Sequence, residues 1–595
     1  MAAVETAESG YALRGVCLLV VLLTARAVVV AGRGVTLSVW SPFAYLWQDL
    51  LVAAMFVAVD ARVKRPRIAW TSYGALVLYV ALNVPVTRVL STPLTSTILR
   101  AARGPLADAV VHYVTIVNVG ALALPVAVGV ALPRLLKSRV TRITPAAAMA
   151  ALVVIAIGPF ATSRVDTEGL HRNALGALIE TSVTRVAAKT ASDDWRATDA
   201  TEEHERTRNQ SNPDLTSLRG SMRGRNVVLI ALESTGARRL GLYGSVPDPA
   251  PNLTALAAQS SIVFERAYAV YPESIKGLFA TLCSQYPAFD TAPEVYARVP
   301  CGSVAGRLSA AGYRTALLHS GRFMYLGMRS VIDDRGFDVM EDAGAIGGRA
   351  DSSFGIEDES TVKRALKWID SGARQVPFFM TYLPTSGHNP YVTSRPGPYE
   401  ANSDFWRYMN ALHESDAALG ILVEGLRQRQ LLGNTLFVIF GDHGEAFGEH
   451  PGNFAHTLFI HEENVRIPLV IVAPGSARPP VRVSRVASVI DIAPTILDLV
   501  GLPPDHLHQG ASLLPAETRM ALFYTDYSIG WLGLVDGCSK YLYDVDLGRS
   551  RLFDVCADPG ETQDTAAAYP QRVVAYKDRV VAWASAQKAR IERQQ

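Results

Sequence analysis

The chain has 595 residues, of which 49% are apolar and 19% charged, and its formal net charge is +2. This length suffices for several domains, whereas the nearly balanced charge gives no general case for nucleic-acid binding, and we expect no nucleic-acid partner. The apolar residues are concentrated before about residue 162. The composition therefore predicts a membrane part followed by a soluble part.

Five apolar segments open the chain, and each has about the 20 residues that a helix needs to cross a bilayer. Their approximate ranges are 12–31, 43–61, 69–90, 108–132 and 143–161. We expect the first to be retained rather than cleaved, because it lacks a clear small-residue cleavage site. Basic residues occupy two of the loops, namely Arg62, Lys64, Arg65, Arg67, Arg134, Lys137, Arg139 and Arg142. Because such loops remain cytoplasmic, we expect a multi-pass protein of the cell membrane with a cytoplasmic N-terminus and an extracytoplasmic C-terminal part.

Cysteine usage fits an oxidising compartment. Cys17 lies in the first apolar segment, and the other four cysteines form two local pairs, Cys283 with Cys301 and Cys538 with Cys556. Such pairs suit two disulfides. The connectivity does not follow from the sequence, and buried thiols are the alternative.

Residues 163–225 are expected to form a juxtamembrane linker, because much of this stretch is polar and poor in large apolar residues. From Asn226 onward, short apolar runs alternate with helical patterns. This alternation predicts an α/β domain with a doubly wound, mostly parallel sheet.

Acidic and imidazole side chains follow several of the predicted strands. They are Glu233, His319, His388 and the pair Asp442 and His443. Strand ends in a doubly wound sheet share one edge, so these side chains are expected to converge. Carboxylate oxygen and imidazole nitrogen from Glu233, Asp442 and His443 would suit a divalent metal ion. For Asp442 and His443 alone, a polar turn is the alternative.

A nucleophile is expected where Ser274 begins an apolar run suited to a helix, with Lys276 nearby. A helix N-terminus favours bound phosphate or sulfate. The alternative is that Ser274 is only a helix cap. Thr281 is a second candidate, but it lies inside the predicted helix.

Residues of about 225–580 resemble the sulfatase family within the alkaline-phosphatase superfamily. The resemblance rests on the strand from Asn226 to Thr235, the turn Gly441-Asp442-His443-Gly444-Glu445, Arg466-Ile467-Pro468-Leu469, Lys540-Tyr541, Leu552-Phe553-Asp554-Val555 and Asp558-Pro559-Gly560-Glu561. Five apolar segments before such a domain look like lipoteichoic-acid synthases and phosphoethanolamine transferases. The resemblance implies an α-helical membrane domain (1–162), a doubly wound sulfatase-like catalytic domain (226–520) and a C-terminal subdomain (521–595).

The resemblance also implies roles for individual residues. One divalent ion, which could be Mn, Mg, Zn or Ca, would be held by Glu233, Ser274, Asp442 and His443. The substrate would be bound by His319, Arg329, His388 and His456. Two departures leave phosphate and sulfate esters both open: Ser274 stands where the transferases have threonine, and no Cys-x-Pro-x-Arg frame of true sulfatases is present.

These observations predict a membrane-anchored enzyme that acts on lipid-linked or glycan phosphate or sulfate esters. Ser274, activated by the metal and by Lys276, would attack the ester, and an acceptor hydroxyl or water would resolve the covalent product with His388 as acid or base. Phosphoglycerol or phosphoethanolamine transfer is the favoured activity. The alternatives are sulfuric ester hydrolysis, a non-catalytic receptor for anions and a transporter.

Overall fold

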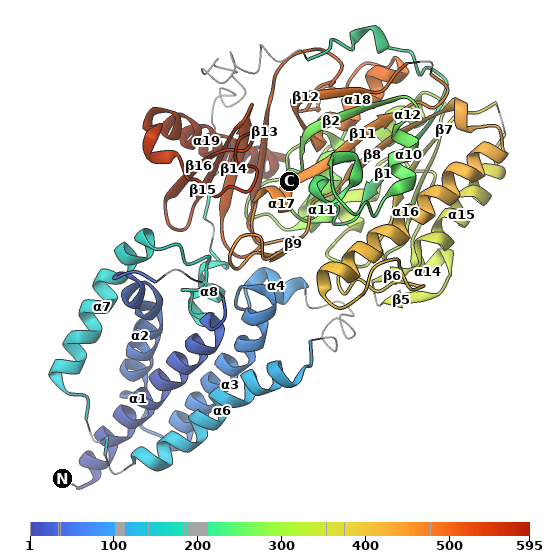
Figure 1. The fold of residues 1–595 in the computed structure, drawn as a ribbon. Helices are drawn as coiled ribbons and strands as arrows, with labels where there is room; N and C mark the ends of the chain where they lie inside the picture. Colours follow the sequence, from blue (N-terminus) through green and yellow to red (C-terminus); the bar gives the residue numbers. More distant parts are fainter. Residues whose placement is uncertain are drawn as a thin grey trace.

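The computed structural model describes residues 2–33, 35, 37–101, 113–137, 139–140, 142–183, 185–188, 212–352, 354–373, 375–476 and 478–594. A bundle of helices at the N-terminal end adjoins a larger α/β part (Figure 1). Parts of two predictions lie outside the described residues: 108–112 of the fourth apolar segment and 189–211 of the linker.

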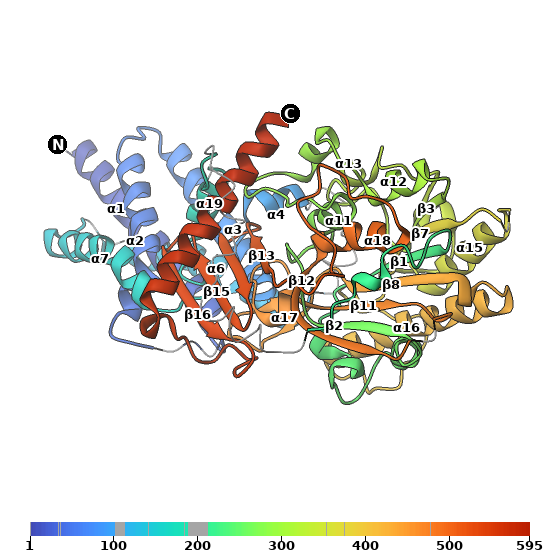
Figure 2. The same ribbon diagram turned by 90° about the horizontal axis from the view of Figure 1, so that it is seen from above.

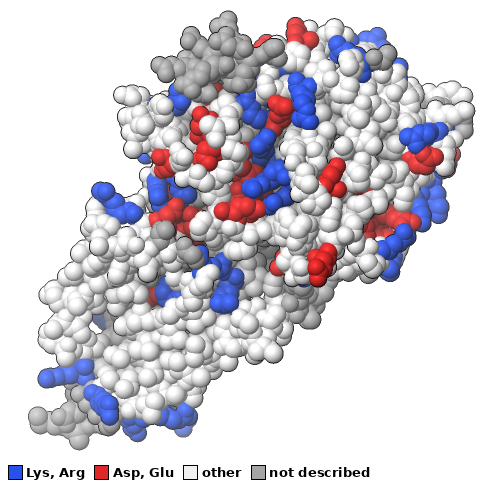
Figure 3. Space-filling model, in the orientation of Figure 1, with Lys and Arg blue, Asp and Glu red and all other residues white. Residues whose placement is uncertain are grey.

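Five helices in the described part of the chain are long and apolar enough to cross a membrane. They are α1 (Ala2–Val30), α2 (Ser41–Asp60), α3 (Pro66–Leu90), α6 (Ile116–Leu136) and α7 (Pro145–Arg164). Lys and Arg side chains gather at the end of the bundle that lies away from the α/β part, and the flanks are almost free of charge (Figure 3). The helices therefore fit the membrane anchor that the sequence predicts.

Polar contacts join the bundle to the α/β part. The short helices α4 (Ser96–Ala101) and α8 (Ala174–Glu180) lie at this junction. Arg172 Nη1 donates to Ser528 Oγ at 2.8 Å, and Arg551 Nη2 pairs with Asp166 Oδ2 at 2.7 Å. Each of these contacts joins positions hundreds of residues apart in the sequence, so the two parts are joined by a tertiary interface as well as by the connecting chain.

The centre of the α/β part is an eight-stranded sheet with the order β12-β2-β11-β8-β1-β7-β3-β4. Its strands are β1 (Asn226–Leu232), β2 (Ser261–Tyr268), β3 (Arg314–His319), β4 (Val339–Glu341), β7 (Phe378–Leu383), β8 (Thr435–Gly441), β11 (Arg466–Val472) and β12 (Val481–Ser488). Strand β11 runs antiparallel to both neighbours, and the other pairs are parallel. The predicted α/β class is confirmed, with a mixed sheet.

Helices cover both faces of this sheet (Figure 2). One core packs α11 (Ser274–Cys283), α12 (Val304–Ala310) and α18 (Ile492–Val500) against alternate residues of β1 and β8. The other core packs α10 (Pro251–Ala257), α15 (Asp358–Asp370) and α16 (Asp404–Gln428) against the remaining residues. Burial on both faces explains why the central strands read as continuous apolar runs rather than alternating ones.

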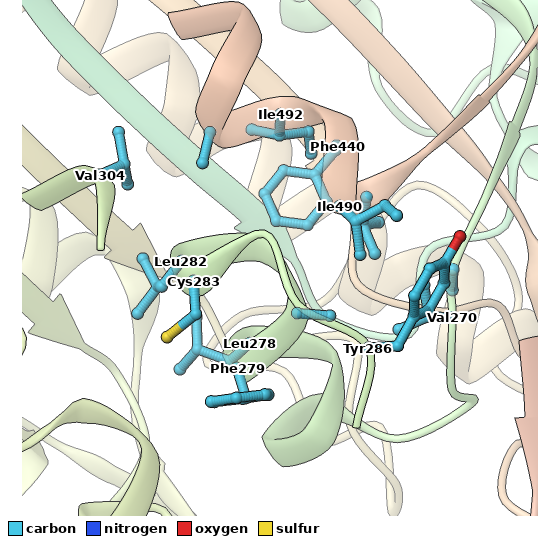
Figure 4. Packing of buried hydrophobic residues seen from close by; sticks show 14 of the residues in the cluster. Val270, Leu278, Phe279, Leu282, Cys283, Tyr286, Val304, Phe440, Ile490 and Ile492 are labelled. Atoms are coloured by element: carbon cyan, nitrogen blue, oxygen red, sulfur yellow. The ribbon is translucent and has the colours of Figure 1, made fainter. Parts of the chain in front are cut away.

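Helix α11 is fixed firmly within the first core. Leu278, Phe279 and Leu282 belong to the buried cluster that also contains Phe440 of β8 and Ile490 (Figure 4). The last residue of the helix, Cys283, forms a disulfide with Cys301. A helix held in this way gives its first residue a defined position at the edge of the sheet.

The C-terminal part adds a four-stranded antiparallel sheet, β13 (Met520–Thr525), β14 (Trp531–Asp536), β15 (Ser539–Asp544) and β16 (Arg549–Asp554), and helix α19 (Pro570–Gln594). Cys538 and Cys556 form the second disulfide. The remaining short elements are α13 (Arg329–Ile332), α14 (Ala343–Ile346), α17 (Glu462–Val465), β5 (Ala350–Ser352), β6 (Gly355–Ile356), β9 (Ala446–Phe447) and β10 (Phe454–Ala455).

A buried charge network joins the C-terminal part to the central domain. Lys540 Nζ lies 3.1 Å from Glu462 Oε1 and 3.0 Å from Glu561 Oε1, and all three side chains are almost fully buried. Glu561 also accepts the backbone N–H of Glu462 at 2.7 Å. The Asp-Pro-Gly-Glu segment therefore anchors α17, the turn that leads into β11.

Candidate active site

The candidate site begins where two neighbouring strands end. Leu232 of β1 pairs with Gly441 of β8, so Glu233 and Asp442 leave the sheet side by side. A Cβ atom at Gly441 would lie 2.1 Å from the carbonyl oxygen of Thr235, which explains why glycine occupies this position. The close approach of the two chains brings both carboxylates to one point at the sheet edge.

Hydrogen bonds fix the Asp442 carboxylate. Its Oδ1 atom accepts the backbone N–H groups of Ser234 at 2.9 Å and of His443 at 2.8 Å. Ser234 holds a φ of 54°, a left-handed conformation that costs a non-glycine residue about 1 kcal/mol or more. The Oδ2 atom is left to face the cavity.

Ser274 completes this group from the first position of α11. Its Oγ atom lies 2.7 Å from Asp442 Oδ2, 3.2 Å from Glu233 Oε2 and 3.3 Å from His443 Nε2. One hydroxyl proton can serve only one of these acceptors at a time. The structure therefore brings together all four residues for which the sequence predicts metal binding.

The N-terminus of α11 is capped by the residue before the nucleophile candidate. Glu273 accepts the N–H groups of Ile275 at 3.0 Å and Lys276 at 3.3 Å. A side-chain cap stabilises a helix by about 1 kcal/mol. Because Glu273 is the cap, Ser274 itself is not, and the alternative role for Ser274 as a helix cap is wrong.

The electrostatics of this group favour a bound cation. Burial, and then the neighbouring Asp442, raise the pKa of Glu233 to about 8. Burial lowers the pKa of His443, but Asp442 and Glu233 outweigh it and raise the pKa overall. Glu233, Asp442 and His443 can offer ligand atoms within 4.8 Å of one another. Two buried carboxylates, an imidazole and a hydroxyl fit a divalent ion in charge and in donor type.

Two further histidines lie beside this group. His456 Nδ1 lies 2.6 Å from Glu445 Oε2, and its ring centroid is 4.2 Å from that of His443. His388 Nδ1 lies 2.6 Å from the carbonyl oxygen of Asn389, so Nδ1 carries the proton and Nε2 is left as an acceptor. Burial, and then His456, lower the pKa of His388 to about 4.

A cavity of about 350 Å³ opens onto Ser274, and His319, His388 and His456 line it. His319 Nδ1 lies 3.1 Å from the carbonyl oxygen of Leu383. Burial lowers the pKa of the His319 imidazole. The membrane part contributes to the same lining through Val89, Leu90, Thr92, Ile98 and Tyr113.

Two of the sequence predictions do not fit this geometry. Lys276 Nζ lies 2.9 Å from both Oδ1 and Oδ2 of Asp526 in a buried ion pair, rather than beside Ser274. Arg329 is 60% exposed, pairs with Asp333 at 3.4 Å and is not among the residues that line the cavity. We therefore correct both assignments: Lys276 stabilises the fold around α11, and Arg329 is a surface residue.

The cavity also contains residues to which the sequence analysis gave no role. Arg322 lines it three positions after His319, and no ion pair of Arg322 is found among the described residues. Because Arg322 follows closely after a strand that ends in histidine, its position in the sequence could have identified it as a candidate site residue. Tyr325 and Phe354 line the cavity too, but nothing in their local sequence marks them.

Comparisons with known proteins show what the chain is similar to. Residues 225–502 match the sulfatase family model. Arylsulfatase K of Canis lupus familiaris is 33% identical over 180 residues, which cover 27% of this chain and 32% of that protein. The chain thus spans about a third of the length of the curated relatives it matches.

Two solved structures share the fold. A protein in the alkaline phosphatase superfamily from Vibrio parahaemolyticus superimposes with a TM-score of 0.52 at 20% identity, covering 68% of this chain and 99% of that one. BT4656, solved in complex with its substrate D-glucosamine-2-N,6-O-disulfate, superimposes with a TM-score of 0.51 at 18% identity, covering 62% and 98%. The chain therefore shares its fold with these two proteins. Residues 225–502 are similar to the sulfatase family of enzymes, in agreement with the prediction from the sequence.

Proposed function

We propose that the chain is a membrane-anchored, metal-dependent enzyme that uses Ser274 to cleave or transfer a phosphate or sulfate ester. The observation that carries this proposal is the position of Ser274 Oγ between Asp442 Oδ2, Glu233 Oε2 and His443 Nε2. A divalent ion held by these four residues would lower the pKa of the Ser274 hydroxyl and stabilise the charge of the ester oxygens.

The first half of the reaction follows from the contacts of Ser274. Its hydroxyl donates to Asp442 Oδ2 at 2.7 Å, so this carboxylate takes the proton as Oγ attacks. A bond forms between Oγ and the phosphorus, the bond to the leaving oxygen breaks, and the leaving oxygen takes up a proton from solvent. Arg322 in the cavity lining offers a guanidinium group to the anionic oxygens of the ester.

The second half of the reaction needs a base for the incoming hydroxyl. His388 suits this role, because its lowered pKa keeps it neutral at pH 7 and Nε2 is an acceptor. The acceptor oxygen bonds to the phosphorus, its proton moves to Nε2 and then to solvent, the bond to Ser274 Oγ breaks, and Oγ regains its proton from Asp442 Oδ2. With a hydroxyl as acceptor the result is transfer, and with water it is hydrolysis.

The donor is best described as a lipid-linked ester, with phosphoglycerol or phosphoethanolamine as the transferred group. In support, Val89, Leu90 and Ile98 of the membrane part line the cavity that contains Ser274. These apolar side chains suit the glyceride end of a lipid rather than a free sugar ester. Membrane lipids are thus the proposed partners.

The proposed topology has a cytoplasmic N-terminus and an extracytoplasmic catalytic domain in the cell membrane. The basic loops near Arg65 and Arg139 support it, since positive loops stay in the cytoplasm. We propose a membrane domain at 1–162, a junction at 163–225, a catalytic domain at 226–520 and a C-terminal subdomain at 521–595.

Sulfuric ester hydrolysis is the second candidate function. The similarity to arylsulfatase K over 180 residues favours it. The charge and shape of a sulfate ester resemble those of a phosphate ester, so the same four residues would serve.

Mass spectrometry of the intact chain separates the candidates. The full chain in detergent would be incubated with phosphatidylglycerol, phosphatidylethanolamine or an aryl sulfate, and then digested. We expect a Ser274 peptide that carries phosphoglycerol or phosphoethanolamine, and a sulfated peptide would indicate the second candidate. Ser274→Ala should abolish the adduct and Ser274→Thr should retain it. Turnover by Ser274→Ala at the wild-type rate would refute the proposal.

A further inference from the structure

Exposed apolar side chains surround the entrance of the cavity that contains Ser274. Leu90, Leu326 and Phe454 line the cavity and are between 37% and 41% exposed. Because these side chains face both the cavity and the surface, they mark the place where the cavity opens. Met324, two positions before Leu326, is 63% exposed. Large apolar groups that gather at an opening in this way mark a surface that contacts lipid or another protein.

The loop that carries Met324 and Leu326 is fixed at both ends. Phe323 and Met328 belong to the buried core of the α/β part. Leu326 has a φ of 48°, a left-handed conformation that costs a non-glycine residue about 1 kcal/mol or more. The chain thus holds two apolar side chains outwards between two buried ones. Burial of its ends explains why the loop is ordered, but it leaves Met324 and Leu326 exposed.

The ends of two membrane helices place the entrance at the surface of the bilayer. Helix α3 ends at Leu90, and both Val89 and Leu90 line the cavity. Tyr113 lines the same cavity, three positions before α6 begins at Ile116. Both helices are long and apolar enough to cross a membrane, so their ends lie where the hydrocarbon region meets the headgroups. Side chains that share the cavity with these ends, Leu326 among them, therefore lie near the same level.

Two arginines at this level suit the phosphate groups of lipids. The Arg33 guanidinium lies 5.6 Å from the centroid of the Phe454 ring, and Arg88 is in the last turn of α3. Arg33 Nη1 donates to Ser91 Oγ at 2.9 Å, and Arg88 Nη1 donates to the Val28 carbonyl oxygen at 3.1 Å. In the part of the chain that the structure describes, neither arginine pairs with a carboxylate. Two unpaired cations between membrane helices suit anionic lipid headgroups.

We propose that residues 323–328 insert into the leaflet next to the α/β part and form, with the ends of α3 and α6, a lipid entrance to the cavity. Met324 and Leu326 reach the acyl chains, and Arg33 and Arg88 hold the phosphate group of an anionic phospholipid at the border. The partner is a lipid surface rather than another protein, because the membrane helices bring the bilayer to this face. The insertion does not depend on the proposed chemistry, whereas passage of the reacting lipid through this entrance rests on the proposed function.

Fluorescence quenching in nanodiscs measures the insertion without turnover. The full chain with Met324→Cys would carry a bimane label, and Cys17→Ser would remove the free cysteine while both disulfides stay in place. The nanodiscs would contain phosphatidylcholine and phosphatidylglycerol, with or without a nitroxide near the headgroup end of an acyl chain. We expect the nitroxide to lower the emission at position 324 by at least about twofold, because interfacial groups reach about 5–10 Å into the boundary between headgroups and acyl chains.

Asn434→Cys in the same background is the control. Asn434 is exposed and directly precedes β8, at the opposite end of that strand from Gly441 and the candidate site. Its label should not be quenched by the nitroxide. The insertion is overturned if the label at position 324 is quenched no more than the label at position 434. Thermal unfolding shows whether each variant is folded, and Leu326→Cys provides a second position if Met324→Cys is not.

Native mass spectrometry tests the headgroup contact separately. The full chain with Arg33→Gln and Arg88→Gln should retain at least one phosphatidylglycerol molecule fewer than the wild type, whereas Arg329→Gln, a change at an exposed arginine, should retain as many. Inorganic phosphate at millimolar concentration should not displace the retained lipid, because it lacks the acyl chains that the apolar entrance holds. Equal retention by the double variant, or displacement by free phosphate, would contradict this part of the proposal.

These outcomes are distinguishable from that of the proposed function. Absence of a Ser274 adduct in the otherwise wild-type chain contradicts the covalent chemistry, whatever the labels show. Absence of quenching at position 324 contradicts the insertion, even where the adduct forms.

Discussion

Replacing Lys276 with methionine removes one half of a buried ion pair. Lys276 Nζ lies 2.9 Å from both carboxylate oxygens of Asp526, and each side chain is 6% exposed. Asp526 also accepts the Tyr271 hydroxyl at 2.7 Å and the Asp290 N–H at 2.6 Å, so it cannot turn towards water without breaking these bonds. Loss of one partner from such a pair costs about 3–5 kcal/mol, because the other charge stays buried.

The effect of Lys276→Met should depend on pH. Burial raises the pKa of Asp526, but Lys276 and Arg185 outweigh it, so the pKa is lowered in the folded protein. A lowered carboxyl pKa contributes stability above the pKa of the unfolded chain, about 3.9, and that contribution is lost as the pH falls through the folded value. The difference in the free energy of unfolding between the wild type and Lys276→Met should therefore have its largest value at pH 7 and become smaller in strong acid.

Thermal unfolding of the detergent-solubilised chain measures this loss, and the Ser274 adduct per folded molecule measures the chemistry. We expect a large drop in melting temperature with the adduct reduced by less than about tenfold. Arg329→Met is the control: its ion pair with Asp333 is 60% and 43% exposed, so its loss should change stability by no more than about 0.5 kcal/mol. If Lys276→Met left the melting temperature unchanged but abolished the adduct, Lys276 would be an activating group and our assignment would fail.

Three further changes test the site and its support. Glu233→Gln should lower divalent-metal affinity by at least about 100-fold by calorimetry, and wild-type affinity should weaken as the pH falls below 8, because protons compete at a carboxyl whose pKa is about 8. Arg322→Met should slow formation of the Ser274 adduct by about 10–100-fold, the value of a charged hydrogen bond, with metal content unchanged by elemental analysis; an unaltered rate would remove Arg322 from the site. Replacing Cys283 and Cys301 with serine should destabilise the chain by about 2–4 kcal/mol in unfolding measurements, whereas the Cys17→Ser control keeps both disulfides and should unfold like the wild type.

The group of candidate metal ligands was predictable because the sheet topology decides where it lies. Apolar runs ending in Glu233 and in Asp442 identify two buried strands, and parallel strands end at a common edge. The pairing of Leu232 with Gly441 then places the two acids side by side. Ser274 was predictable for a related reason, since an apolar run that follows a polar segment identifies the start of a helix.

Lys276 shows where sequence proximity misleads. Two positions along an α-helix turn a side chain by roughly 200°, so residues i and i+2 face opposite sides. Ser274 faces the sheet edge, and Lys276 consequently faces Asp526 of the C-terminal part, 250 positions away. No local pattern identifies that partner. Arg329 fails for a different reason, because it begins the short helix α13 at the surface rather than following a strand.

The cavity itself is the feature that local reasoning cannot supply, because two parts of the chain build it. Asn389, next to His388, donates to the hydroxyl of Tyr113 at 2.9 Å, across 276 positions. Leu90 at the end of α3 and Phe454 of β10 line the same cavity. A helix bundle that served only as an anchor would need only long, apolar helices. These contacts show that the membrane part also forms part of the cavity surface that, in the proposed enzyme, contacts the substrate. The bundle therefore has two roles in the proposed enzyme: it holds the site at the bilayer, and it forms the aliphatic side of the cavity in which Ser274 reacts.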